Sequence, residues 1–451
     1  MKAIKRTERD SHGEIEVDAN RLWGAQTERS RRNFKISYMK MPGEIISALT
    51  YIKKACAIAN CKLGKLSKEK AEAVISACED IIQDKYPDEF PLSVWQTGSG
   101  TQTNMNVNEV IAHIGAKEKL HPNDDVNMSQ SSNDTFPSAI CISGVIAVKK
   151  VMEACNALEA SLNKLAEKSK GIIKIGRTHY QDAVPLYFSD EINAWRYDIL
   201  KPVSMLEDAI SHLSYLAIGG TAVGSGLNAP HNFDKEVCRV LSEELGHSFL
   251  PDENKFHALS SKDAVVFAHG ALKALAANLF KIATDIRFLS SGPRCGIGEL
   301  SIPENEPGSS IMPGKVNPTQ CEALSMICVQ VMGNDTAIGI AASQGHLELN
   351  VFMPLIAYNF LQSCNLLCDS IKSFTEKCVD GIRINRERVQ SNLDNSLMLV
   401  TALKEVIGYE KAAEIAHHAH RNGITLRESA LQLGLCDAQT FDKYVRADKM
   451  V

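Results

Sequence analysis

Several features of common functional classes are missing from this chain of 451 residues. No stretch approaches about 18 uninterrupted apolar residues, so no membrane span is expected. The formal net charge of -5 provides no basic surface for a nucleic-acid backbone. The N-terminal residues Met1–Asp10 lack the apolar run of a signal peptide and carry acids that transit peptides avoid. We therefore expect a cytoplasmic protein that binds neither nucleic acid nor membrane.

Metal and nucleotide motifs are also missing. The 13 cysteines form no Cys-x-x-Cys pair, and their odd number and scattered positions are typical of reduced thiols. Three histidines lie together at His417–His420, but no carboxylate or cysteine completes a ligand set, so no metal site is expected. The glycine-rich stretch Gly219–Asn228 is followed by no Gly-Lys-Ser/Thr and does not match the dinucleotide fingerprint. The sequence therefore implies no nucleotide cofactor.

Long helical patterns are abundant. Apolar residues recur every three or four positions from Val145 to Leu165, from Leu206 to Leu216, from Leu272 to Leu289, from Leu324 to Val331 and from Phe352 to Phe374. Such spacing is typical of helices packed lengthwise. We expect an all-α fold with a central bundle of about five long helices, whose wide apolar stripes suit an oligomer.

Three domains are expected from the change in pattern along the chain. Residues 1–130 mix charged turns with shorter helices, and residues 131–384 contain the long-helix bundle. In residues 385–451 the helices shorten, and Thr425–Glu428 predicts a capping box at the start of one of them. This last segment is expected to be a small helical domain.

One polar loop interrupts the long helices at Gly308–Pro318. Its two glycines, two prolines, serine pair, lysine and asparagine cannot continue a helix. Backbone amides, hydroxyls and a cation together suit the binding of a carboxylate or a developing negative charge. A helix start with Asn317 as N-cap and Gln320 as its capping-box partner explains part of the loop, but not Ser309, Ser310 or Lys315.

Three further connections carry similar side chains, at Thr97–Asn106, His121–Asp134 and Ile175–Pro185. Small hydroxyl and amide groups in loops suit hydrogen bonding to carboxylate oxygens. The same residue types also form ordinary turns and helix caps. A single histidine such as His179 is more often structural than catalytic.

Taken together, these stretches resemble the fumarase/aspartase superfamily, with the class II fumarases closest. Gly308–Pro318 is similar to the superfamily signature GSSxMPxKxNP, and the other stretches follow in the expected order over nearly the whole chain. The resemblance implies a three-domain helical fold in a homotetramer, with active sites built from loops of three subunits. It also implies fumarate hydratase activity of the tricarboxylic acid cycle, without metal or organic cofactor.

The resemblance implies a role for each matching residue. The catalytic group would be Ser309 as the base at C3 of malate, Lys315 beside the aci-carboxylate, His179 at the departing water and Glu322 orienting that histidine. Substrate binding would involve Ser99, Thr101, Ser131, Ser132, Asn133, Thr178, Lys315 and Asn317. A second anion site near the entrance would contain His121, Asn123 and Asp124.

Two alternatives remain open at the level of sequence. Aspartate ammonia-lyases share the scaffold, but they usually have Gln at the position of His179 and lack the His and Asp of His121–Asp124. A non-catalytic structural member, like the lens crystallins of the superfamily, would not need Ser309, Lys315 and Glu322 together. The chain departs from the usual class II pattern at His257, at Lys262 and at Tyr187–Asp190.

Overall fold

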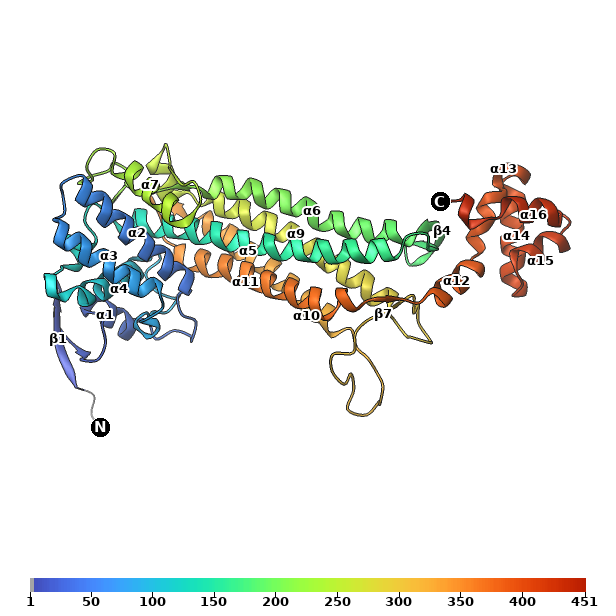
Figure 1. Cartoon of the computed structure of the whole chain (residues 1–451), viewed down its shortest axis with the longest axis horizontal. Coiled ribbons are helices and arrows are strands. Elements are labelled where there is room, and N and C mark those ends of the chain that lie inside the picture. The colour runs from blue at the N-terminus through green and yellow to red at the C-terminus, as the bar shows by residue number, and fades with distance from the viewer. Residues whose placement is uncertain (1–3) are drawn as a thin grey trace. The chain divides into compact units, whose positions relative to one another are not determined.

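The computed structural model describes residues 4–451 (Figure 1). Residues 1–3, part of the stretch assessed for a signal peptide, lie outside this range. The chain forms two compact units, the first from Met1–Met152, Pro202–Ala276 and Val329–Cys368, and the second from Glu153–Lys201, Ala277–Cys328 and Asp369–Val451.

Five long helices dominate the fold and have residues in both units. They are α5 (Ser132–Lys168), α6 (Phe188–Leu213), α9 (Asp263–Leu289), α10 (Thr319–Ala342) and α11 (Met353–Lys377). The apolar stripe predicted in α9 is buried, and Leu272, Leu279 and Ile286 have no exposed surface. The expected all-α fold with five long helices is confirmed.

Within each unit the long helices are joined by buried polar contacts as well as apolar packing. In the first unit, His269 of α9 contacts Asp335 of α10 at 3.0 Å and Ser363 of α11 at 2.9 Å. In the second, the indole of Trp195 on α6 donates to Asp285 of α9 at 3.0 Å. Such contacts fix the register of lengthwise packed helices.

Shorter elements complete the first unit. They are the hairpin β1 (Lys5–Asp10) and β2 (Gly13–Asp18), then α1 (Ala25–Asn33), α2 (Gly43–Lys62), α3 (Lys68–Ile82), α4 (Thr101–Ile114), α7 (Phe233–Leu245), α8 (Lys255–Ser260), the parallel pair β5 (Tyr215–Leu216) and β6 (Leu250–Pro251), and the hairpin β8 (Gly345–His346) and β9 (Leu349–Asn350). Helix α2 packs against α3 and α7.

The second unit contains an antiparallel hairpin that the sequence did not predict, β3 (Ile173–Thr178) and β4 (Gln181–Tyr187). It also contains the pair β7 (Leu300–Ser301) and β10 (Arg383–Ile384). Its C-terminal helices are α12 (Arg386–Asp394), α13 (Lys404–Ile407), α14 (Tyr409–Asn422), α15 (Leu426–Gln432) and α16 (Ala438–Tyr444). The predicted capping box at Thr425 and Glu428 is confirmed. Residues from Val400 to Phe441 share an apolar core. The division of the chain into three domains stays a prediction.

By length and composition alone, α9 and α10 are apolar enough to cross a membrane. The sequence predicted no membrane span, because neither helix is an uninterrupted apolar run. The two helices differ from that expectation. Core helices of globular proteins meet the same criterion, so two such helices are a weak indication of a membrane protein.

Candidate functional site

The loop Gly308–Pro318 lies in the second unit, immediately before α10. The Ser309 hydroxyl oxygen accepts hydrogen bonds from the backbone amides of Met312 at 3.1 Å and Ile311 at 3.3 Å. Ser309 is partly buried, whereas the following residues up to Lys315 are exposed. Two amides directed at one hydroxyl oxygen favour a negative charge on that oxygen.

The loop is closed across its base. The Gly308 amide donates to the Lys315 carbonyl at 3.1 Å, and the Asn317 side-chain amide donates to the Gly308 carbonyl at 2.5 Å. A Cβ at position 308 would lie 2.1 Å from the Lys315 carbonyl oxygen, so only glycine fits. The predicted N-cap role of Asn317 is wrong, because α10 begins at Thr319 and the Asn317 amide closes the loop instead. Gln320 accepts a hydrogen bond from Ser373 and completes no capping box.

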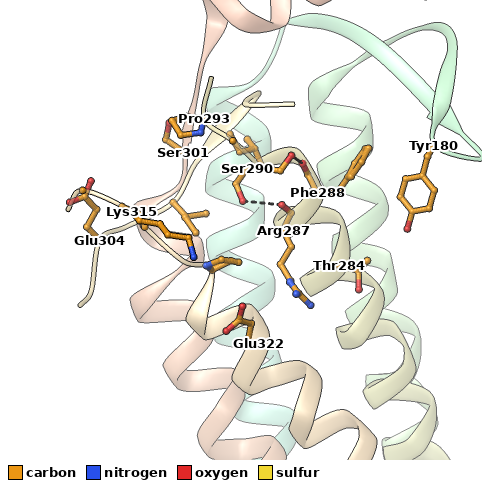
Figure 2. A pocket seen from close by; sticks show the side chains of 17 residues that line it. Tyr180, Thr284, Arg287, Phe288, Ser290, Pro293, Ser301, Glu304, Lys315 and Glu322 are labelled. Atoms are coloured by element: carbon orange, nitrogen blue, oxygen red, sulfur yellow. Dashed lines mark hydrogen bonds between the residues drawn. The ribbon is translucent and has the colours of Figure 1, made fainter. Parts of the chain in front are cut away.

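A cavity of about 610 Å³ lies beside this loop in the second unit. Lys315 and Glu322 line it, together with Tyr180 and with Arg287 and Phe288 of α9. Figure 2 shows Lys315 on the loop, Glu322 on the first turns of α10 and Arg287 on the neighbouring helix. The structure thus brings two of the predicted catalytic residues, Lys315 and Glu322, to one cavity.

Thr178 and His179 lie at the end of the β3–β4 hairpin. Thr178 pairs with Gln181, so His179 and Tyr180 form a two-residue turn, with φ of 55° and 60°. A turn with both central residues at positive φ ordinarily favours Asn-Gly. Non-glycine residues in this conformation are uncommon and concentrate at functional positions. His179 is exposed at the tip, and the Tyr180 ring contacts Phe288 edge-on at 5.0 Å.

A buried charge network holds the base of the hairpin. Glu299, with no exposed surface, accepts from Arg177 at 2.6 and 3.1 Å and lies 3.3 Å from the Lys174 amine. The Asn392 amide donates to the same carboxylate at 2.9 Å. Burial alone would raise the pKa of Glu299, but these partners hold it below its ordinary value. No sequence pattern indicates this network, because its members are far apart in the chain.

In the first unit, Ser99 and Thr101 flank the start of α4. Their hydroxyl oxygens are 2.8 Å apart, and Gly100 between them has a φ of 73°. A Cβ at position 100 would lie 2.3 Å from the Phe136 ring, so glycine allows the loop to approach α5. The two hydroxyls therefore lie beside the partial positive charge of a helix N-terminus.

The start of α5 is capped by side chains and also carries three predicted substrate-binding residues. The Ser131 hydroxyl accepts from the Asn133 amide at 3.2 Å, and Asp134 accepts from the Ser131 amide at 2.9 Å. The other Asp134 oxygen accepts from the amides of Gly219 and Thr221 at 3.1 and 2.8 Å. Burial raises the pKa of Asp134 to about 6. Asp134, given no role from sequence, thus ties the Ser131–Asn133 turn to the glycine-rich loop.

Asn104 of α4 joins the two helix starts. Its amide donates to the Ser132 hydroxyl at 3.0 Å and to the Asn127 side-chain oxygen at 3.2 Å. Its own oxygen accepts from Thr135 at 3.2 Å. Ser99, Thr101, Ser131 and Ser132 therefore belong to two helix N-termini that one buried amide holds in register.

The residues predicted for a second anion site also lie in the first unit. His121 and Asn123 line a cavity of about 670 Å³ that extends to Lys119. The His121 ring accepts from the Asp124 amide at 3.1 Å and lies 3.1 Å from its carboxylate. Asp124 itself is not part of the cavity lining.

The structure explains one departure from the class II pattern. The buried Lys262 amine donates to the carbonyls of Ala258, Leu259 and Ser261, so it caps the C-terminus of α8. His257 lies 3.5 Å from Asp263 at the surface. Tyr187–Asp190 spans the end of β4 and the start of α6. None of these positions contacts a predicted site residue through a described hydrogen bond.

The predicted site residues thus fall into two groups. Ser99, Thr101, Ser131, Ser132, Asn133 and the second anion site belong to the first unit; Thr178, His179, Ser309, Lys315, Asn317 and Glu322 belong to the second. Within residues 4–451, no three His, Cys, Asp or Glu side chains are grouped so that they could hold a metal ion.

Comparison with known proteins identifies the family. The family described as Lyase matches residues 13–333, and that described as Fumarase C C-terminus matches residues 399–451. Fumarate hydratase class II of Helicobacter pylori strain J99 is 55% identical over 99% of this chain and 98% of its own, and that of Bacillus subtilis is 54% identical with the same coverage.

Solved structures agree. A class II fumarase from Schistosoma mansoni superposes with a TM-score of 0.97 at 43% identity, covering 99% of both chains. A protein from Brucella melitensis described as fumarate lyase:delta crystallin, bound to cobalt, gives a TM-score of 0.95 at 39% identity, again covering 99% of both chains. The chain belongs to the class II fumarases of the fumarase/aspartase superfamily.

Proposed function

We propose that this chain is a fumarate hydratase of the tricarboxylic acid cycle, which catalyses the reversible anti addition of water to fumarate to give (S)-malate. The identity of 54–55% over nearly full length with proteins named class II fumarate hydratase supports the reaction. The structural observation that carries the proposal is the Ser309 oxygen, which accepts from two backbone amides. A reaction that uses no organic cofactor or metal is in keeping with the family resemblance.

The difficult step is removal of the C3 proton of malate, which is weakly acidic. In the proposed reaction the base is the Ser309 alkoxide, whose negative charge the amides of Ile311 and Met312 favour; the C3–H bond breaks and the proton moves to this oxygen, giving the hydroxyl. The electron pair moves into the neighbouring carboxylate and gives an aci-carboxylate. Lys315 and Asn317 would stabilise that charge, because catalysis requires binding the intermediate more strongly than malate.

Collapse of this intermediate forms the C2=C3 double bond and breaks the C2–O bond. The departing hydroxide takes a proton through His179, with Thr178 holding the resulting water and Glu322 orienting the imidazole. The exposed tip position of His179 suits a side chain that must reach a substrate. Hydration of fumarate is the reverse of these steps.

Recognition of the substrate would use the first-unit group. Four hydroxyls lie at two helix N-termini, where backbone dipoles favour carboxylates. They belong to Ser99, Thr101, Ser131 and Ser132. Ser131 and Ser132 accept hydrogen bonds from Asn133 and Asn104, so each keeps its own hydrogen to donate. His121, Asn123 and Asp124 would form the second anion site.

We further propose a homotetramer in which the Ser309 loop and the His179 tip of one active site come from different chains, with three chains contributing to each site. An unusually exposed apolar surface on α10 supports an assembly: Met326 is 68% exposed, Val329 58% and Ile340 63%. The three-domain division and a cytoplasmic location belong to the same proposal.

Subunit mixing tests the shared site. Ser309→Ala and His179→Asn chains, each with little or no activity alone, are unfolded together and refolded, and activity is measured against each variant refolded alone. Random assembly restores both groups at about a quarter of the sites. Absence of any recovery in a correctly sized assembly would place both groups in one chain.

The reaction itself is tested by ultraviolet absorbance on adding the purified chain to (S)-malate and, separately, to L-aspartate. A rise with malate alone, from the conjugated double bond of fumarate, is expected. A rise with aspartate alone would identify an ammonia-lyase instead, and silence with both would favour a non-catalytic member.

A further inference from the structure

A buried lysine lies behind the first-unit group of substrate-binding residues. Lys53, in the middle of α2, has no exposed surface. Its amine donates to the side-chain oxygens of Asn127 at 2.9 Å and Gln130 at 2.8 Å. Within residues 4–451 no carboxylate lies within ion-pair distance of this amine. Fully buried lysines without an acidic partner are rare, because burial of an unpaired charge is costly.

The amine determines how the neighbouring amides are oriented. A lysine ammonium has three donors and no acceptor, so Asn127 and Gln130 must both turn an oxygen toward it. The same Asn127 oxygen accepts from the Asn104 amide at 3.2 Å. Asn104 therefore faces Asn127 and Ser132 with its NH2 group and Thr135 with its oxygen.

The orientation of Asn104 determines the direction of the Ser132 hydroxyl. Because Asn104 donates to the Ser132 oxygen at 3.0 Å, the Ser132 hydrogen is directed away from Asn104 and is available to a substrate oxygen. If Asn104 turned over, its oxygen would face Ser132 and capture that hydrogen. The polarity of this chain of hydrogen bonds thus begins at the Lys53 ammonium, which can only donate.

We propose that Lys53 is a positioning residue, whose ammonium orients Asn127 and Asn104 so that Ser132 donates its hydroxyl hydrogen to a carboxylate of the dicarboxylate substrate. This inference rests on the proposed function. Among the described residues no carboxylate lies within ion-pair distance of Lys53, so its positive charge favours an anion at the start of α5.

The titratable groups around Lys53 set the pH at which this role ends. Burial lowers the pKa of Lys53 to about 8, while Cys56, Asp134 and Cys78 act in the opposite direction. Burial raises the pKa of the Cys56 and Cys78 thiols, which therefore stay neutral. Burial also raises the pKa of Asp134 to about 6. The ammonium is present below about pH 8 and is lost above it, so substrate binding should weaken as pH rises through that value.

The test compares Lys53→Met with Lys54→Met. Lys54 is the adjacent lysine of the same helix, but it pairs with Glu244 at 3.0 Å and Glu79 at 3.3 Å. We expect Lys53→Met to raise KM for both fumarate and malate about ten-fold, with kcat changed less than about three-fold, and Lys54→Met to leave both constants within about two-fold. Binding of succinate, measured calorimetrically, should weaken in parallel for Lys53→Met.

Unchanged KM and succinate affinity in folded, assembled Lys53→Met would overturn the proposal. If that variant does not fold, the pH dependence of KM in the wild-type chain tests the proposal. Its KM for fumarate should rise between about pH 7 and 9, and the Lys53→Arg variant, which keeps its charge, should show no such rise. A flat wild-type KM over this range would contradict the role of Lys53. A wild-type chain without hydratase activity would refute the proposed function instead, and succinate binding would still test Lys53.

Discussion

Replacing Glu299 by Gln should destabilise the protein and disturb the hairpin that carries His179. Glu299 is completely buried and neutralises Arg177 through two hydrogen bonds, with Lys174 3.3 Å away. The neutral amide would leave the mostly buried guanidinium with only the exposed carboxylate of Asp182, 4.0 Å away, although Lys174 keeps Glu191 at 2.9 Å. Removing one partner of a buried ion pair costs about 3–5 kcal/mol.

The size of the effect on thermal stability follows from chain length. A chain of 451 residues has an unfolding entropy of about 0.9 kcal/mol/K, so this loss lowers Tm by about 3–5 °C. Scanning calorimetry at fixed protein concentration measures the shift. Glu167→Gln is the matched control, because Glu167 pairs with Lys170 at the surface and its loss should move Tm by less than about 1 °C.

The pH dependence has a definite sign. The pKa of Glu299 is held below its ordinary value of 4.5 in the folded chain, so its contribution to stability is present above that value and lost as pH falls through the folded pKa. The Tm difference between wild type and Glu299→Gln should therefore shrink in acid. Equal Tm values for the two proteins at neutral pH would refute the reasoning about this network.

Three further predictions concern the site. Ser309→Ala should abolish turnover while circular dichroism and assembly size stay unchanged; activity near that of wild type would contradict its role as the base. His179→Asn should lower kcat about 10²- to 10⁴-fold with a modest change in KM, and an unchanged kcat would contradict its role in protonating the departing hydroxide. Gly308→Ala should reduce kcat/KM by at least about ten-fold, because its Cβ would meet the Lys315 carbonyl at 2.1 Å, whereas Gly339→Ala, where the added Cβ meets no atom, should retain activity.

The long helices were predictable because their apolar spacing is strong and local. Leu272 to Leu289 follows a three-four alternation, and every one of those positions is buried. The same holds for the capping box at Thr425, whose two members are three residues apart. Resemblance to a family with a known signature then supplied the site residues and their predicted roles.

The missed features lack a clear local sequence signal. The β3–β4 hairpin was not expected, because His179 and Tyr180 replace the Asn-Gly that usually marks such a turn. Asn317 fits the pattern of an N-cap, but a carbonyl nine residues earlier binds its amide instead. Lys53 looks like any charged residue of an amphipathic helix, and its burial depends on amides more than 70 residues away.

The central claim is that this chain hydrates fumarate by anti addition at C2 and C3. Proton magnetic resonance of the product formed from fumarate in deuterated water tests it most directly. The account predicts (S)-malate with one deuteron at C3, in the single position that anti addition gives, and loss of the product with Ser309→Ala. Absence of malate, or deuterium distributed over both C3 positions at early times, would contradict the account.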